Sequence, residues 1–99
     1  MFEIRFGDRG EIVLSGRFDA SQERKASAVF DALTEPKVVD LKALEYISSM
    51  GLGILLKTQK RLKASSGNGL QLVNVNQHIN DIFRFSGFHQ VFDIETGSG

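Results

Sequence analysis

The sequence predicts an α/β fold in which a mixed β-sheet carries helices packed on it. Three observations predict this class: a glycine-rich turn joins two strand-like segments at the start of the chain, amphipathic helical segments alternate with strands after it, and the composition is that of an ordinary globular protein, with 41% hydrophobic and 24% charged residues. A length of 99 residues allows one hydrophobic core and not two. We therefore expect a single domain over residues 1–95, followed by a flexible tail at 96–99.

An antiparallel hairpin is predicted at the start of the chain. Phe2, Ile4 and Phe6 alternate with charged residues, and a second apolar segment at 12–14 follows the glycine-rich turn at 7–10. The first two strands of the sheet are therefore expected to be antiparallel neighbours.

Two amphipathic helices are predicted in the first two thirds of the chain. The apolar spacing of the first begins at Ser21 and predicts an end near Thr34, just before the only proline, Pro36. The second helix follows the serine pair at 48–49, and Gly67 fits its C-terminal cap. It is expected to be the longest helix of the chain.

Three further strands alternate with the helices. The run at 38–41 is rich in β-branched residues, which favours a central strand buried on both faces, as in a parallel sheet. Residues 70–75 and 91–94 supply the next two strands, and a third helix between them is capped by Asn76 and ended by Gly87. This order is that of a βαβ series.

The composition excludes several classes of function. Twelve basic and twelve acidic residues give a net charge of zero, so the chain has no overall field to attract nucleic acid or a membrane surface. Without cysteine there is no thiolate nucleophile and no Cys-rich zinc site, and no metal or cofactor is expected. No apolar run has the length of a signal peptide or a membrane span, so we expect a cytoplasmic location.

The segment at 46–49 is predicted to be a loop leading into the second helix, where functional groups gather in sheets of this kind. Ser48 or Ser49 can cap the helix. Gly51 and Gly53 follow in its first turn, where each glycine costs about 1 kcal/mol relative to alanine. Two explanations remain open: the glycines let another protein's backbone come close, or they let the helix pack against a strand.

These segments together resemble the STAS domain family. The similarity covers nearly the whole chain in the right order, and its most specific part is the segment around the serine pair. The similar segments are Val38–Leu41, Glu45–Leu52, Gly16–Ala20, Leu70–Val75, Phe85–Phe88 and Val91–Phe92. The resemblance implies an anti-sigma factor antagonist, which is a protein-binding switch of bacteria and not an enzyme.

The resemblance also implies a site. In the family, an aspartate ends the central strand, and a serine or threonine at the start of the next helix is phosphorylated by a partner that is both a serine kinase and an anti-sigma factor. Asp40 and Ser49 match these positions, with Asp40 expected to support the loop. Ser48 stands where the family often has an aspartate, and whether it is a second acceptor stays open.

The partners follow from the same resemblance. The unphosphorylated protein is expected to bind an anti-sigma factor of the histidine-kinase-like ATPase type and to release a sigma factor, and a PP2C-type phosphatase is expected to reset the switch. The residues expected to contact the partner are Phe18, Asp19, Ser48, Ser49, Met50, Gly51, Leu52 and Gly53.

Two other functions compete with this one. An enzyme with Ser49 as nucleophile needs a base nearby, and the only histidines, His78 and His89, lie in no known nucleophile motif. Nucleotide binding would need a glycine where Leu56 stands, so the phosphate-loop pattern breaks there. Weak nucleotide binding nevertheless stays open, because some STAS domains bind nucleotide.

A different assembly is the remaining alternative. STAS domains also occur in stressosomes, in lipid-transport complexes and on anion transporters, and only the last is disfavoured by the lack of a membrane segment. The basic face of the second helix, formed by Lys57, Lys60, Arg61 and Lys63, is assigned no role.

Overall fold

The computed structural model describes residues 1–97. In chain order the elements are β1 (Glu3–Phe6), β2 (Ile12–Phe18), the 3₁₀ helix η1 (Ala20–Gln22), α1 (Glu23–Phe30), β3 (Lys37–Ile47), α2 (Ser49–Ser66), β4 (Leu70–Val75), α3 (Gln77–Ser86), the 3₁₀ helix η2 (Phe88–Gln90) and β5 (Asp93–Thr96). Five strands form one mixed sheet with helices packed on it, which confirms the predicted fold class.

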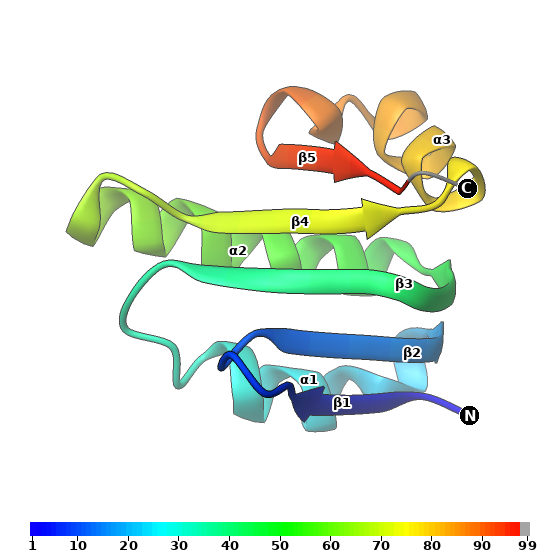
Figure 1. The fold of residues 1–99 in the computed structure, drawn as a ribbon, viewed down its shortest axis with the longest axis horizontal. Coiled ribbons are helices and arrows are strands. Elements are labelled where there is room, and N and C mark those ends of the chain that lie inside the picture. The colour runs from blue at the N-terminus through cyan, green and yellow to red at the C-terminus, as the bar shows by residue number, and fades with distance from the viewer. Residues whose placement is uncertain (98–99) are drawn as a thin grey trace.

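The strands lie in the sheet in the order of the sequence, β1-β2-β3-β4-β5. β1 and β2 form the predicted antiparallel hairpin, and β2 to β5 are parallel to one another. Because parallel crossovers are right-handed, three successive crossovers in one direction place their helices on the same face. In Figure 1, α1 and α2 accordingly lie behind the sheet, and α3 lies beside the carboxyl end of β4.

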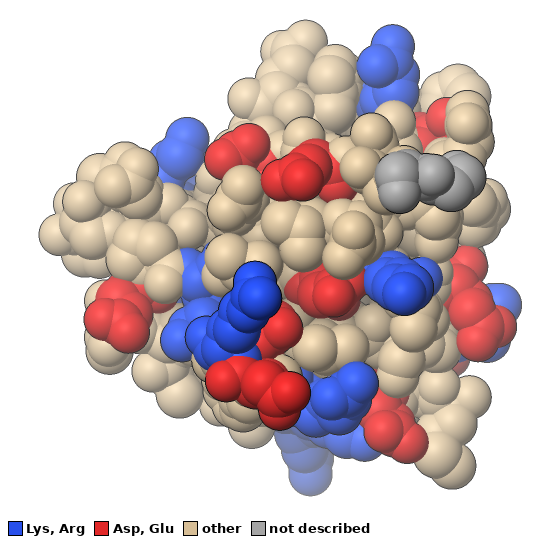
Figure 2. Space-filling view, viewed as in Figure 1, with Lys and Arg blue, Asp and Glu red and all other residues tan. Residues whose placement is uncertain are grey.

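The other face of the sheet is open. Val39 and Leu41 of β3 are fully buried on the helix side, whereas Val38 and Asp40, which alternate with them, are only half-buried. The expectation that the central strand is buried on both faces is therefore wrong, because no helix formed by residues 1–97 covers the second face. Figure 2 shows acidic and basic side chains interspersed over this open face.

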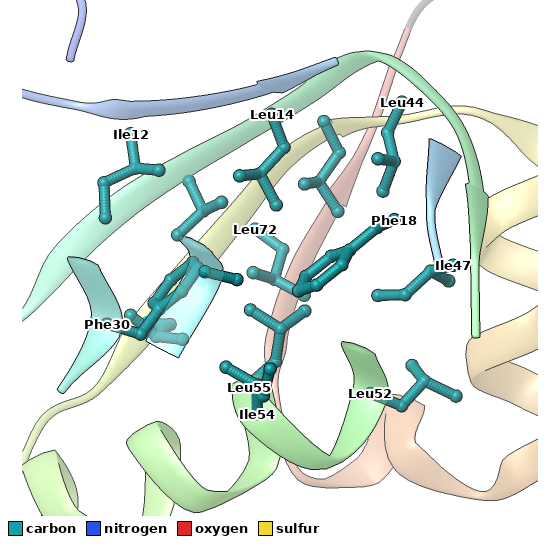
Figure 3. Close-up of a cluster of buried hydrophobic side chains, with 14 of the residues drawn as sticks. Ile12, Leu14, Phe18, Phe30, Leu44, Ile47, Leu52, Ile54, Leu55 and Leu72 are labelled. Atoms are coloured by element: carbon teal, nitrogen blue, oxygen red, sulfur yellow. The ribbon is translucent and has the colours of Figure 1, made fainter. Parts of the chain in front are cut away.

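The core fills the space between the sheet and the helices (Figure 3). Ile12, Leu14 and Leu72 from the strands meet Phe30 of α1 and Leu55 of α2, and all five are completely buried. Each such side chain contributes about 1.5–3 kcal/mol of burial free energy. This packing fixes α1 and α2 side by side on the sheet.

β3 is longer than predicted and contains two irregularities. Its pairing with β2 shifts once beyond Val13 and again beyond Gly16. The shifts change which side chains face the core, so Leu41, Leu44 and Ile47 are buried at three-residue spacing rather than two. The segment expected to be a loop at 46–49 is therefore strand up to Ile47, and α2 begins two residues later.

The predicted helix caps are confirmed, but one helix end is not. Gly67 and Gly87 adopt the left-handed conformation at the ends of α2 and α3, and Asn76 accepts a hydrogen bond from Ile79 N at 2.9 Å. α1 ends at Phe30, four residues before the expected end.

The last strand also lies later than expected. β5 spans Asp93–Thr96 rather than 91–94, because η2 occupies the preceding segment. Thr96 pairs with Val75, and Gly97 N donates a hydrogen bond to Val75 O at 3.1 Å. Residues 96 and 97 are thus attached to the sheet, contrary to the expected tail, and 98–99 lie outside the described residues.

Candidate functional site

The serine pair lies where β3 ends and α2 begins. Ser48 is the N-cap residue, and its Oγ accepts a hydrogen bond from Gly51 N at 3.2 Å. Its backbone is fixed as well, since Ser48 N donates to Phe18 O at 2.9 Å and Leu52 N donates to Ser48 O at 2.9 Å. The Ser48 hydroxyl is therefore engaged in holding the start of the helix.

Ser49 is the first residue of α2, and its side chain is exposed. Within residues 1–97, its hydroxyl makes no hydrogen bond, and the N–H groups of Ser49 and Met50 have no acceptor. Free N–H groups at a helix N-terminus, together with the positive end of the helix dipole, favour a negatively charged group. The site thus combines an accessible hydroxyl with surroundings that tolerate an anion.

Ser49 opens onto a groove of about 550 Å³ between α1 and α2. One end holds Ser49, and at the other Lys57 Nζ lies 3.9 Å from Asp31 Oδ1 in an exposed ion pair. The lining residues are Ala20, Glu23, Ser27, Asp31, Ser49, Met50, Gly53, Ile54 and Lys57.

Both walls of the groove are rows of residues spaced four apart. α1 and the turn after it supply Glu23, Ser27 and Asp31, and α2 supplies Ser49, Gly53 and Lys57 in the same spacing. Such rows form the ridges of a helix surface. The sequence shows the four-residue spacing of Glu23, Ser27 and Asp31, but nothing in it places α1 next to α2. The α1 wall of the groove was therefore not predicted.

The two glycines of the first turn have different surroundings. A Cβ on Gly51 would lie 2.8 Å from Ile47 Cγ1 and 3.1 Å from Phe18 Cγ, so packing on the strand ends requires this glycine. A Cβ on Gly53 would meet nothing within 4 Å. Packing thus explains Gly51, while Gly53 leaves open space at the α2 wall of the groove.

Three of the expected partner contacts are buried in the domain. Phe18 is fully buried, Leu52 is 6% exposed, and Gly51 is buried against Ile47 and Phe18. Their expected role as contacts is corrected by this packing, because the core already surrounds them. Met50 is 38% exposed and lines the groove. Of the other members of the expected set, Ser49 and Gly53 are exposed, and Asp19 and Ser48 are half-buried.

Asp40 does not support the serine loop, contrary to expectation. It lies inside β3, which continues for seven residues beyond it, and its side chain is on the open face of the sheet. Its Oδ1 accepts hydrogen bonds from Lys42 N at 2.9 Å and from Asn74 Nδ2 at 3.2 Å. Asp40 therefore stabilises the irregular part of β3.

Asp19 lies at the exit of β2, next to the groove. Its Oδ1 accepts hydrogen bonds from the hydroxyl and the backbone N–H of Ser21. The hydrogen bond from the Ser21 hydroxyl lowers the pKa of the Asp19 carboxyl, and the backbone bond and the Arg17 charge act in the same direction. Asp19 is thus ionised at neutral pH and begins η1, whose first residue lines the groove.

The competing functions find little support in this geometry. Neither His78 nor His89 lines the groove beside Ser49, so no histidine base faces the hydroxyl there. Gly51 is packed against the core and so leaves no space for a phosphate-binding loop. Over residues 1–97, no cluster of metal-ligating side chains forms, and no helix is both long and apolar enough to span a bilayer.

Several solved structures with a similar fold are described as anti-sigma factor antagonists. A STAS domain protein of Planctomyces limnophilus is 15% identical and matches 98% of this chain and 90% of its own with a TM-score of 0.73. SpoIIAA of Bacillus, in its unphosphorylated form, is 22% identical and matches 97% of this chain and 89% of its own with a TM-score of 0.65. Its phosphorylated form matches with the same TM-score, at 21% identity and over 97% and 92% of the two chains. At these identities the likeness concerns the fold.

Similarity in sequence is more specific. BtrV of Bordetella bronchiseptica, described as a candidate anti-sigma factor antagonist, is 35% identical over 72 residues, which are 73% of this chain. The match spans 61% of that relative's length. The family model described as "Mlab, STAS domain" matches residues 4–95. Because that match covers every strand and helix except the first residue of β1 and the last residue of β5, the chain belongs to the STAS domain family.

Proposed function

We propose that this protein is an anti-sigma factor antagonist whose partner binding is controlled by phosphorylation of Ser49. The observation that carries the proposal is the exposed, unengaged Ser49 hydroxyl at one end of the α1–α2 groove. The description of BtrV as an anti-sigma factor antagonist and the phosphorylated form of SpoIIAA support it. Ser49 is preferred over Ser48 as acceptor, because the Ser48 hydroxyl already binds Gly51 N.

The isolated domain tolerates a phosphate on Ser49. Phosphorylation adds about −1.5 to −2 charges at neutral pH. The free N–H groups and the dipole at the start of α2 stabilise a negative group there by about 0.3–1 kcal/mol. Glu23 lines the same groove, but its carboxylate is exposed to solvent, which screens the repulsion. The fold is therefore expected to survive the modification.

A bound partner changes this balance. If the partner covers Ser49, the phosphate loses its hydrating water without gaining a positive partner charge. Lys57 is the one basic residue that lines the groove, and it lies two helical turns away beside Asp31. A loss of about 2.7 kcal/mol already weakens binding about a hundredfold. Phosphorylation thus separates partners without unfolding the domain.

The cycle has two covalent steps. An anti-sigma factor of the histidine-kinase-like ATPase type binds the unmodified protein and releases a sigma factor. The kinase then transfers the γ-phosphoryl group of ATP to Ser49 Oγ, leaving ADP, and the hydroxyl proton passes to the kinase or to solvent. A PP2C-type phosphatase hydrolyses the phosphoserine with water, releasing inorganic phosphate. We place this cycle in the cytoplasm.

A pull-down with four versions of the chain tests the proposal. The parent and Ser49→Ala are expected to retain an ATPase of the histidine-kinase-like type from a lysate of the source cells, and Ser49→Asp to retain at least about tenfold less. Ser65→Asp is the matched control, because it adds the same charge to α2 about 24 Å from Ser49. Mass spectrometry of the parent after incubation with the captured kinase and ATP locates the phosphate.

Two results would contradict the proposal. One is equal retention of the kinase by the parent and by Ser49→Asp, with circular dichroism showing both to be folded. The other is a phosphate on a residue other than Ser49.

A further inference from the structure

A pair of stacked aromatic rings lies beneath the first turn of α2. The rings of Phe2 and Phe18 are stacked with centroids 4.7 Å apart and an interplanar angle of 27°, and both side chains are buried. Phe18 also approaches Gly51 so closely that a Cβ there would lie 3.1 Å from Phe18 Cγ. The Phe18 carbonyl also accepts the hydrogen bond from Ser48 N. Phe18 thus contacts the start of the helix through both its ring and its backbone.

Phe2 is held in this place by contacts of its own. Gly16 has φ +83°, and its missing Cβ leaves room for the Met1 carbonyl, which passes directly over it. Lys25 Nζ of α1 donates a hydrogen bond to Phe2 O at 3.1 Å, and the same ammonium lies 5.9 Å from the Phe2 ring centroid. The segment before β1 is therefore fixed between β2 and α1, with the ring of Phe2 against Phe18.

We infer that Phe2 is a positioning residue for Ser49: by stacking on Phe18 it holds the first turn of α2, and with it the Ser49 hydroxyl, in one place. Phe18 has no freedom to move toward Gly51, where contact is already tight, but it can move into any space that a smaller residue 2 leaves. Such a movement would loosen the bond from Ser48 N to Phe18 O and the Ser48 cap. This inference deepens the proposed function and rests on it for its biological meaning.

The first test measures hydrogen exchange in the purified chain by NMR. Phe2→Leu is compared with Phe92→Leu, a matched control whose ring is 6% exposed and packs edge-on against Phe83 with centroids 5.6 Å apart. Phe2→Leu is expected to speed exchange of the Gly51 and Leu52 amides about tenfold more than it speeds exchange elsewhere in the core. Phe92→Leu is expected to lack this excess. The inference is overturned if both variants speed exchange at Gly51 and Leu52, relative to the rest of the core, by the same factor.

The second test uses the kinase captured with the parent chain, ATP and each variant as substrate. If a variant is partly unfolded, only its folded fraction is a substrate, so its apparent KM rises. Its kcat is unchanged, because a saturating concentration of the variant restores the rate. A displaced Ser49 also lowers kcat, and we expect a fall of about tenfold for Phe2→Leu and little change for Phe92→Leu. Equal kcat values for Phe2→Leu and the parent would contradict the positioning role.

The two proposals fail in different ways. If the captured kinase leaves Ser49 of the parent unmodified, the proposed function fails, while the exchange result still decides whether Phe2 fixes the start of α2. If the parent is phosphorylated on Ser49 but Phe2→Leu changes neither kcat nor the exchange of Gly51 and Leu52, only the positioning inference fails.

Discussion

Two adjacent serines have separate tasks at the start of α2. Ser48 uses its hydroxyl as an acceptor for Gly51 N and its N–H as a donor to Phe18 O, so it joins the helix to the end of β2. Ser49 uses its hydroxyl for no contact within residues 1–97 and projects to the surface. The first residue therefore stabilises the start of the helix, and the hydroxyl of the second is left unengaged.

This division predicts different costs for two alanine substitutions. Ser48→Ala removes the cap and is expected to lower the free energy of unfolding by about 1 kcal/mol. Ser49→Ala removes no hydrogen bond and is expected to change it by less than about 0.5 kcal/mol. Urea unfolding of both variants and the parent measures the difference. Equal destabilisation by the two substitutions would mean that the hydroxyls share the capping role.

The residue types in this segment predicted the capping but not the residue that performs it. Either serine satisfies the cap pattern, and the choice depends on where β3 ends, which two pairing shifts against β2 decide. Phe18 and Leu52 were expected at the partner surface for a similar reason. An apolar residue beside a functional loop can face the core or the solvent, and only the packed structure shows that both are buried.

At the scale of elements, the two glycines of α2 predict opposite effects. Gly51→Ala places a methyl group against Ile47 and Phe18 and is expected to destabilise the domain by about 1–3 kcal/mol. Gly53→Ala meets open space and is expected to stabilise α2 by up to about 1 kcal/mol. Thermal unfolding measures both. A loss of stability in Gly53→Ala would show that there is less room beside this residue than its surroundings indicate.

Arg61 binds the C-terminal end of α1. Its guanidinium donates to Leu33 O at 2.6 Å and to Phe30 O at 2.8 Å, which are carbonyls at the end of α1 and in the turn after it. The positive charge also complements the negative end of the α1 dipole. A residue of α2 thus binds the C-terminal end of α1 and fixes the two walls of the groove relative to each other.

This contact predicts a specific cost for one basic residue of a face that was assigned no role. Arg61→Met keeps the apolar stem but loses both bonds, and we expect a loss of about 1–3 kcal/mol of unfolding free energy. Lys60→Met, at an exposed neighbouring position of α2, is the control and is expected to cost less than about 0.5 kcal/mol. Chemical denaturation measures the unfolding free energy of the two variants and of the parent. A similar loss of unfolding free energy in the two variants would mean that the hydrogen bonds of Arg61 make no net contribution to stability.

The element boundaries show what local sequence leaves undetermined. The caps at Asn76, Gly67 and Gly87 depend on short-range chemistry, and all three were predicted. The carbonyls at the end of α1 are bound by Arg61, which is about 30 residues away in the sequence, and no local pattern indicates this contact. The length of β3 depends in the same way on its pairing with β2.

At the scale of the whole molecule, the one-sided arrangement of helices follows from strand order. The alternation of strands and helices predicted the α/β class, but not the order in which the strands lie side by side. Once that order is sequential, right-handed crossovers place the helices on one face and leave the other open. The α1–α2 groove exists for the same reason, since two consecutive helices on one face lie next to each other (Figure 1).

The open face predicts opposite tolerance to charge at two neighbouring positions of β3. Val39 is fully buried under the helices, so Val39→Lys is expected to cost at least about 3 kcal/mol or to prevent folding. Val38 is half-buried on the open face, on the same side of the strand as Asp40, so Val38→Lys keeps its ammonium in water near a carboxylate and is expected to cost about 1 kcal/mol or less. Thermal unfolding followed by circular dichroism measures both costs. If Val38→Lys destabilised the protein as much as Val39→Lys, the open face would have to be covered in solution, and the one-sided architecture would describe only part of the working molecule.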